Sequence, residues 1–199
     1  MKPWELYYGI WHTEYKTGKL DLQYTLLVHN DTLYVIFQPT HSVLDWLINL
    51  LSALPLFRYA FGWHLVWVLN EKQILEQVES MVVGRYGLRD VVVTGHSYGG
   101  AVAVSAGIAI RNKLHIAPVL ITFGCPNALM FNKDIKCKFK SVEQWACWND
   151  VVTYLPAWFK NREVKRIGEK FKRWELLKVE KWHYSSYFKE ETYREEENE

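Results

Sequence analysis

The segment Val91–Gly100, which reads Val-Val-Val-Thr-Gly-His-Ser-Tyr-Gly-Gly, decides the fold. Its β-branched start predicts a buried strand, and the small residues from Ala101 to Ile110 predict a helix that packs closely on a sheet. Glycines two residues before and two residues after Ser97 permit a turn so tight that a Cβ atom would meet neighbouring backbone. The pattern predicts the strand, sharp turn and helix of a nucleophile elbow, with Ser97 exposed at the turn. A plain glycine turn between a strand and a helix is the alternative interpretation.

Outward from this segment, strand-like and helix-like stretches alternate. Two short β-rich runs, 24–29 and 32–37, flank Asn30-Asp31 and predict a hairpin at an edge of the sheet. The other expected elements are strands over 117–123 and 139–148, a helix over 42–54, and a helix from Asn70, as its N-cap, to a stop at Gly87. Alternating strands and helices predict an α/β fold with a mainly parallel central sheet and helices on both faces.

Length and composition favour a single folded unit. The 199 residues fit one domain over residues 1–188, and the glutamate-rich segment 189–199 is expected to be a disordered acidic tail. A net charge of +2 with 49% hydrophobic residues argues against both wholesale disorder and nucleic-acid binding. Three cysteines without metal spacing argue against a disulfide framework and a metal site. Residues 1–10 contain no secretory signal pattern, and no stretch predicts a transmembrane helix, so we expect a cytoplasmic protein.

A serine hydroxyl attacks well only when a base takes its proton and a carboxylate orients that base. In α/β-hydrolases the acid and the histidine follow the serine in the chain. His115 and His183 are the two histidines after Ser97, and His115 follows the elbow helix without a strand before it. We therefore predict His183 as the base and Asp150, at the end of the expected strand 139–148, as the acid. A turn-capping Asp150 and a surface His183 are the structural alternatives.

Several segments in order make the chain similar to the class 3 lipase family, the fungal triacylglycerol lipase type of α/β-hydrolase. They are the strand and turn 33–40, Asp45-Trp46, the elbow 94–100, the Thr-Phe-Gly-Cys-Pro segment 122–126, and the segment 149–156 that contains Asp150. Gln38-Pro39 stands where the family has Arg-Gly, and the histidine segment, His183-Tyr-Ser-Ser-Tyr-Phe, matches only loosely.

The resemblance implies a lipid ester hydrolase that acts on acylglycerol-type substrates without a cofactor or a metal. It also implies that the backbone N–H groups of Thr40 and Tyr98 form the oxyanion hole, and that the apolar helix 42–54 is a lid; a core helix is the alternative for that segment. A phospholipase, a soluble-ester carboxylesterase, a cutinase and a peptidase are alternative activities. A catalytically inactive lipid-binding or partner-binding module is the alternative from another class.

Residues 160–181 carry nine lysines and arginines. Such a run usually marks a solvated face, and attraction to an anionic lipid surface is the second interpretation. It would give the protein peripheral contact with membranes. Nothing in the sequence indicates the oligomeric state.

Overall fold

The computed structural model describes residues 2–39, 52, 55–56, 59–84, 88–128, 137–156, 164–169 and 178–193. Its main sheet has seven strands in the order β1-β2-β3-β6-β7-β8-β9. The strands are β1 (Lys16–Thr17), β2 (Gln23–His29), β3 (Thr32–Phe37), β6 (Asp90–His96), β7 (Val119–Phe123), β8 (Ser141–Cys147) and β9 (Val164–Ile167). A small hairpin is separate from this sheet. Its two strands, β4 (Pro55–Leu56) and β5 (Tyr59–Ala60), have two residues each.

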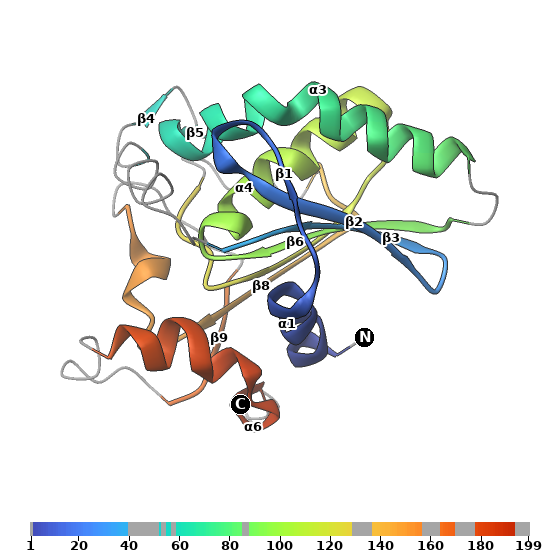
Figure 1. Ribbon diagram of the computed structural model, residues 1–199. Helices are drawn as coiled ribbons and strands as arrows, with labels where there is room; N and C mark the ends of the chain where they lie inside the picture. The colour runs from blue at the N-terminus through green and yellow to red at the C-terminus, as the bar shows by residue number, and fades with distance from the viewer. Residues whose placement is uncertain are drawn as a thin grey trace.

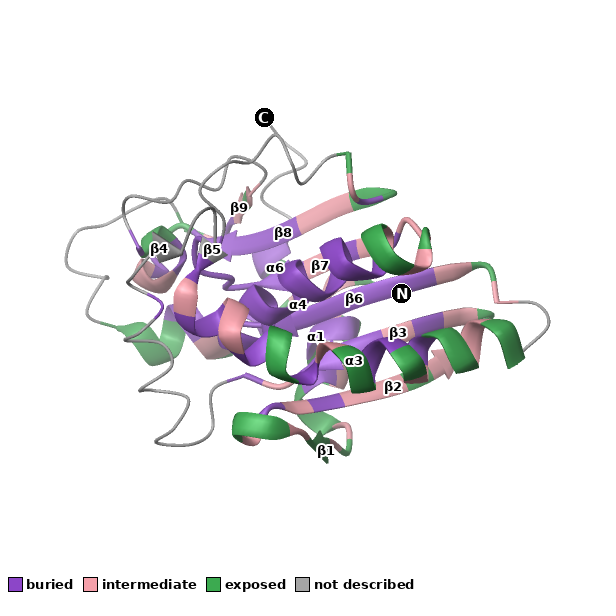
Figure 2. Ribbon diagram, turned by 90° about the horizontal axis from the view of Figure 1, so that it is seen from above, coloured by how far each residue is buried: buried purple, intermediate pink, exposed green. Residues whose placement is uncertain are grey.

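Strand direction divides the sheet into two parts. The first three strands are antiparallel, and the hairpin between β2 and β3 turns at Asn30 and Asp31, both with positive φ, as their sequence predicts. From β3 to β9 every neighbouring pair is parallel, so these strands all end at one edge of the sheet. Strand β6 lies in the middle and is buried over Val91–His96, which fits its unbroken apolar start (Figure 2).

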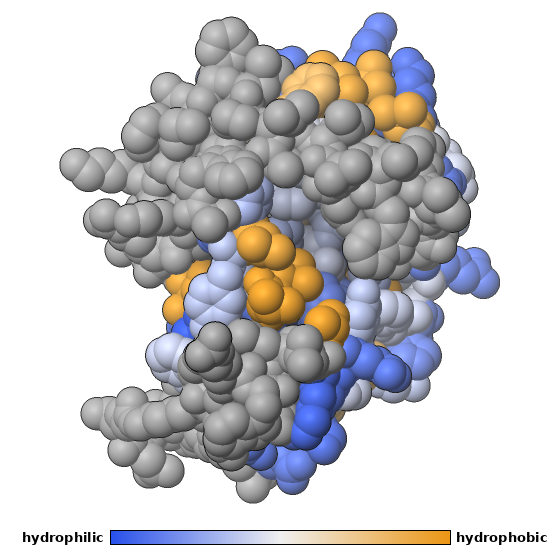
Figure 3. All heavy atoms as spheres, turned by 90° about the vertical axis from the view of Figure 1, so that its left-hand side faces the viewer, coloured by the Kyte–Doolittle hydropathy of each residue, from blue (hydrophilic) through white to orange (hydrophobic). Residues whose placement is uncertain are grey.

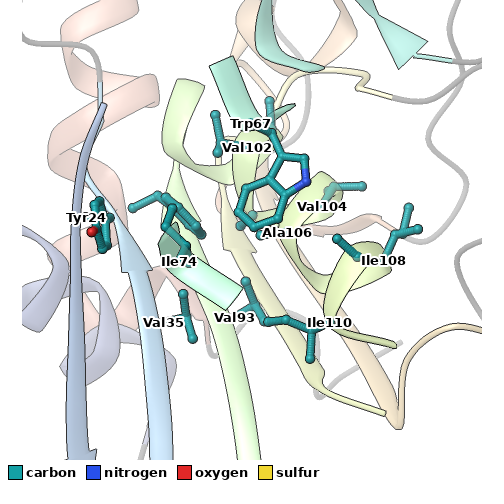
Figure 4. Packing of buried hydrophobic residues seen from close by; sticks show 14 of the residues in the cluster. Tyr24, Val35, Trp67, Ile74, Val93, Val102, Val104, Ala106, Ile108 and Ile110 are labelled. Atoms are coloured by element: carbon teal, nitrogen blue, oxygen red, sulfur yellow. The ribbon is translucent and has the colours of Figure 1, made fainter. Parts of the chain in front are cut away.

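Helices cover both faces of the sheet (Figure 1). On one face lie α3 (Phe61–Gly84) and α4 (Tyr98–Ala109), and on the other lies α1 (Pro3–His12) with the short C-terminal turns η5 (Glu180–Tyr184) and η6 (Ser185–Phe188). The larger core fills the space between α3, α4 and the sheet, where Trp67 and Ile74 of α3 lie over the valines and alanines of α4 (Figure 4). A second core, which includes Tyr7, Phe123 and Tyr187, fills the α1 face. The expected α/β-hydrolase architecture is confirmed.

Helix α3 begins nine residues before the expected N-cap, Asn70. Asn70 is 1% exposed within the helix, where its Oδ1 accepts from the Lys19 N–H at 2.6 Å and its Nδ2 donates to the Lys19 and Val66 carbonyls, both at 2.9 Å. The expectation of an N-cap at Asn70 is therefore wrong, because a buried asparagine can be satisfied by a distant chain segment as well as by its own helix terminus.

The C-terminal boundary of the domain also differs from expectation. Residues Glu190–Tyr193 form a helical turn, α6, in which Tyr193 is buried against Trp4 and Trp145. The Tyr193 hydroxyl donates to the Tyr187 carbonyl at 3.0 Å. The expected boundary after residue 188 is therefore too early, and residues 194–199 lie outside the described chain.

Several other expectations fall on residues that the structure does not describe. The proposed lid 42–54 is represented only by Ser52, whose buried Oγ accepts from the Trp63 N–H at 2.9 Å. Of the basic segment 160–181, the structure describes 164–169 and 178–181. Within the described ranges, every helix is too short or too polar to cross a membrane.

Candidate active site

The turn after β6 has the expected elbow conformation. Ser97 has φ 52° and ψ −122°, directly between β6 and the first residue of α4. A Cβ atom on Gly95 would lie 2.4 Å from the carbonyl carbon of Gly99, and one on Gly99 would lie 2.4 Å from the carbonyl oxygen of Phe37. Because backbone atoms cannot move aside cheaply, both positions require glycine. The Ser97 N–H donates to the Phe123 carbonyl at 2.9 Å, which ties the turn to β7.

The structure brings Ser97 together with both of its predicted partners, although the three residues are far apart in sequence. The Ser97 Oγ lies 2.7 Å from His183 Nε2, and His183 Nδ1 lies 2.9 and 2.8 Å from the two carboxylate oxygens of Asp150. An ionised carboxylate only accepts, so His183 carries its proton on Nδ1 and leaves Nε2 to accept from the serine hydroxyl. All three side chains are buried, which strengthens their electrostatic coupling.

Asp150 is the N-cap of the turn η3 (Val151–Tyr154), three residues after the end of β8. Its Oδ1 accepts from the Val152 N–H at 3.1 Å, and its Oδ2 accepts from the Tyr187 hydroxyl at 2.8 Å. These donors, together with His183, satisfy a carboxylate that is 1% exposed and would otherwise be costly to bury.

Tyr187 is a site residue that the sequence analysis did not identify. Its hydroxyl accepts from the Cys147 N–H at 3.0 Å and donates to Asp150. Burial, followed by the negative charge of Asp150, raises the pKa of Tyr187 well above its usual value, so its hydroxyl remains a donor. The one available signal was its position four residues after His183.

His96, directly before Ser97, also contacts the predicted base and was not identified from sequence. Its Nε2 lies 2.6 Å from the backbone oxygen of His183, and the two imidazole rings lie 4.7 Å apart. Burial, followed by the charge of His183, lowers the pKa of His96 well below its usual value. A neutral His96 therefore donates from Nε2 to hold the His183 backbone.

Helix α1 supports this arrangement from behind. The Tyr7 hydroxyl donates to the Tyr184 carbonyl at 3.1 Å, next to His183. The Tyr7 ring lies 5.3 Å from those of His96 and Tyr187 and 5.1 Å from that of Phe123. These rings fill the layer beneath the three polar residues, so the N-terminal segment contributes to the order of the site.

The remaining predicted site residues have different outcomes. Tyr98 is the first residue of α4, so its backbone N–H belongs to the helix N-terminus, where N–H groups have no acceptor within the helix. Thr40 lies outside the described residues. His115, the alternative base, follows η2 (Ile110–Leu114) at the far end of α4, about 25 Å along the helix from Ser97. In the described part of the chain, no cluster of His, Cys, Asp or Glu could hold a metal ion.

The parallel strands end on one face of the molecule, and an apolar area lies near the centre of that face (Figure 3). On the loop that follows Asp150, Leu155 is 51% exposed. Exposed apolar surface on the face where the parallel strands end is suited to a substrate with a hydrocarbon part.

Solved structures with a similar fold include fungal lipases. A fungal lipase in an inhibitor complex, the basis of a model for interfacial activation, aligns with a TM-score of 0.67 and 17% identity, covering 78% of this chain and 65% of that lipase. A triacylglycerol lipase whose catalytic centre is a serine protease triad aligns with a TM-score of 0.66 and 19% identity, covering 77% and 64%. The native Rhizomucor miehei lipase propeptide complex aligns with a TM-score of 0.64 and 18% identity, covering 79% and 56%.

This chain spans less than two thirds of the length of each of these three lipases. No curated protein matches it in sequence. The family described as Lipase (class 3) matches residues 34–160, which is more than half of the chain and includes Ser97 and Asp150. The chain therefore belongs to the class 3 lipase family.

Proposed function

We propose that the protein hydrolyses lipid esters through an acyl-enzyme, with Ser97 as nucleophile, His183 as general base and acid, and Asp150 as the orienting carboxylate. The observation that carries this proposal is the continuous hydrogen-bonded chain from Ser97 Oγ to His183 Nε2 at 2.7 Å and from His183 Nδ1 to Asp150 at 2.8 Å. Membership of the class 3 lipase family supports the reaction class.

The reaction has two halves. His183 Nε2 takes the proton of Ser97 as Oγ forms a bond to the acyl carbon, and the resulting imidazolium is stabilised by Asp150. His183 then gives the proton to the leaving alkoxide, and the ester bond breaks to leave an acyl group on Ser97. Water, deprotonated by the same Nε2, attacks the acyl group and releases the carboxylic acid with Ser97 restored. No cofactor or metal ion takes part in this scheme.

The tetrahedral oxyanion needs donors aimed at the position where charge develops. We assign this role to the backbone N–H of Tyr98, at the N-terminus of α4, and to Thr40, on the segment that follows β3. Strand β3 pairs with β6 up to Phe37 opposite Gly95, so the segment after β3 leaves the sheet next to the elbow. One such donor contributes about 3 kcal/mol to transition-state stabilisation.

For the substrate we propose acylglycerol-type lipids, because a structurally similar protein is a triacylglycerol lipase and the face where the parallel strands end carries apolar surface. A phospholipase or a soluble-ester carboxylesterase would use the same three residues. The completed hydrogen-bonded set argues against an inactive binding module. Exposed basic residues, among them Lys178 and Lys181, would support peripheral contact with anionic lipid. Cys125 and Cys147 are buried thiols and not disulfide partners, which supports a reducing compartment such as the cytoplasm.

Hydrolysis of p-nitrophenyl esters of increasing chain length, triglyceride emulsion and phospholipid vesicles tests the proposal. The wild type should be active and should favour the longer acyl chains, and Ser97→Ala should reduce turnover to the level of the blank. Ser185→Ala is the matched control, because this exposed serine lies two residues after His183 and its hydroxyl donates to the Lys181 carbonyl at 3.1 Å. An inactive wild type, or a Ser97→Ala variant that keeps its activity, would refute the proposed function.

A further inference from the structure

Arg166, in the edge strand β9, reaches across to the turn that carries Asp150. Its Nη1 donates to the Thr153 Oγ1 at 2.6 Å and to the Cys147 carbonyl at 3.3 Å. Its guanidinium carbon lies 4.2 Å from the centre of the Tyr154 ring, within the range of a cation–π contact. One side chain therefore contacts the residue that ends β8 and two residues of the turn η3.

Arg166 thus contacts the chain both before Asp150, at Cys147, and after it, at Thr153 and Tyr154. The Thr153 hydroxyl donates its single proton to the Asp150 carbonyl at 2.8 Å, and the Thr153 N–H donates to the same oxygen at 3.2 Å. Because that proton is used, the Thr153 Oγ1 can only accept from Arg166. The chain of donors runs from Arg166 through Thr153 to the backbone of Asp150, and it is separate from the contacts of the Asp150 carboxylate.

The Asp150 carboxylate itself has little freedom to adjust. It contacts His183 with both oxygens, the Val152 N–H with one and Tyr187 with the other. The backbone position of Asp150 fixes where its carboxylate can reach. A shift of the turn would therefore break all of these hydrogen bonds together. A misplacement of about 1 Å in such a group can lower a rate about a hundredfold.

We propose that Arg166 is a positioning residue, which acts through the turn 147–154 to hold Asp150 at the place where it orients His183. The inference rests on the proposed function for its kinetic consequence and on the geometry alone for its structural one. The planar guanidinium suits the task, because two hydrogens on one nitrogen serve two acceptors while the plane lies against Tyr154. A lysine would keep the charge but is shorter and has no planar group.

A double-mutant cycle with Asp150→Asn tests this inference. In the wild-type background Arg166→Ala should lower kcat by about tenfold to a hundredfold while KM changes less than about twofold. Asp150→Asn alone should lower kcat by about 10⁴-fold. If Arg166 acts through Asp150, adding Arg166→Ala to Asp150→Asn should lower kcat by less than about a further twofold. Ser97→Ala provides the blank for these slow variants.

Three further variants separate position from charge and from general stability. Thr153→Val removes the hydroxyl that links Arg166 to the Asp150 carbonyl, so it should lower kcat as much as Arg166→Ala does. The double variant with Arg166→Ala should lose no more kcat than either single variant. Arg166→Lys should recover only a small part of the loss. Lys165→Ala is the matched control, because this neighbouring cation lies over the ring of Trp145 and should change kcat less than about twofold. Circular dichroism establishes that each variant is folded. If Arg166→Ala does not fold, Thr153→Val replaces it in the double-mutant cycle with Asp150→Asn.

A second readout needs no turnover. The His183 Nδ1 proton, hydrogen-bonded to Asp150, should give a downfield proton NMR resonance that is absent in His183→Gln. This resonance should broaden or move upfield in Arg166→Ala and Thr153→Val and stay unchanged in Lys165→Ala. An equal loss of kcat from Arg166→Ala in both backgrounds, or an unchanged resonance in that variant, would overturn the inference. An inactive wild type would refute the proposed function alone, and the NMR result would still decide the role of Arg166.

Discussion

The substitution His96→Gln gives a quantitative test of the lowered pKa of the buried histidine next to Ser97. His96 is fully buried, and its Nε2 donates to the His183 carbonyl at 2.6 Å. Glutamine places an amide nitrogen at a similar distance from the backbone, so a donor to that carbonyl is retained while the titratable group is removed. The variant therefore isolates the proton-binding properties of His96.

The sign and size of the effect follow from the lowered pKa of His96. Burial, then the charge of His183, holds this pKa well below the value of about 6.5 that histidine has in an unfolded chain. Below about pH 6.5 the unfolded chain binds a proton that the native protein does not. The free energy of unfolding therefore falls by about 1.4 kcal/mol for each unit by which the pH is lowered. This loss continues until the pH reaches the native pKa, and above about pH 6.5 the residue contributes no slope.

Urea unfolding of wild type and His96→Gln across about pH 8 to 5 measures this slope. The difference in unfolding free energy between the two proteins should be constant above about pH 6.5 and should shift in favour of the variant below it, by at most about 2 kcal/mol at about pH 5. Other titrating groups contribute alike to both proteins and cancel in the difference. Parallel curves over the whole range would show that native His96 binds its proton as readily as the unfolded chain does, and would refute the argument from burial.

Two further predictions concern the residues around the nucleophile. Tyr187→Phe should lower the free energy of unfolding by about 3 kcal/mol, because the Cys147 N–H loses its acceptor and Asp150 loses a donor; a change below about 1 kcal/mol in urea unfolding would contradict this. Gly99→Ala should abolish folding or lower Tm by more than about 10 °C, because its Cβ would lie 2.4 and 2.5 Å from the backbone oxygens of Phe37 and Gln38, whereas Gly84→Ala, with open space at its Cβ, should lower Tm by no more than a few degrees.

The parts of the fold that sequence predicted are those with local causes. The elbow follows from the glycines on both sides of Ser97, and the β2–β3 hairpin follows from Asn30-Asp31. Helix α1 escaped the sequence analysis because its aromatic residues occupy both the buried face, at Tyr7, and the exposed face, at Tyr8, so no clear apolar stripe appears.

The parts that sequence did not predict depend on distant partners. The contact of Arg166 with the Asp150 turn requires the pairing of β9 with β8, which a run of basic residues does not indicate. Tyr193 lies among glutamates and is buried only because Trp4 and Trp145 lie beside it. Ser97, Asp150 and His183 could be chosen from chain order, but Tyr187 and His96 became visible as their neighbours only in three dimensions.

The support that helix α1 gives to the site limits where the gene could recombine with a related gene and still encode an intact site. The segment 34–160, which identifies the family, contains Ser97 and Asp150 but lacks His183 and Tyr7. A recombination breakpoint at either limit of that segment would separate Ser97 from His183, its hydrogen-bond partner, or expose the ring layer under His96 to water. The segment that must come from one parent therefore extends from Pro3 to Tyr193. A chimaera would have to include both flanks of the family segment to keep the site intact.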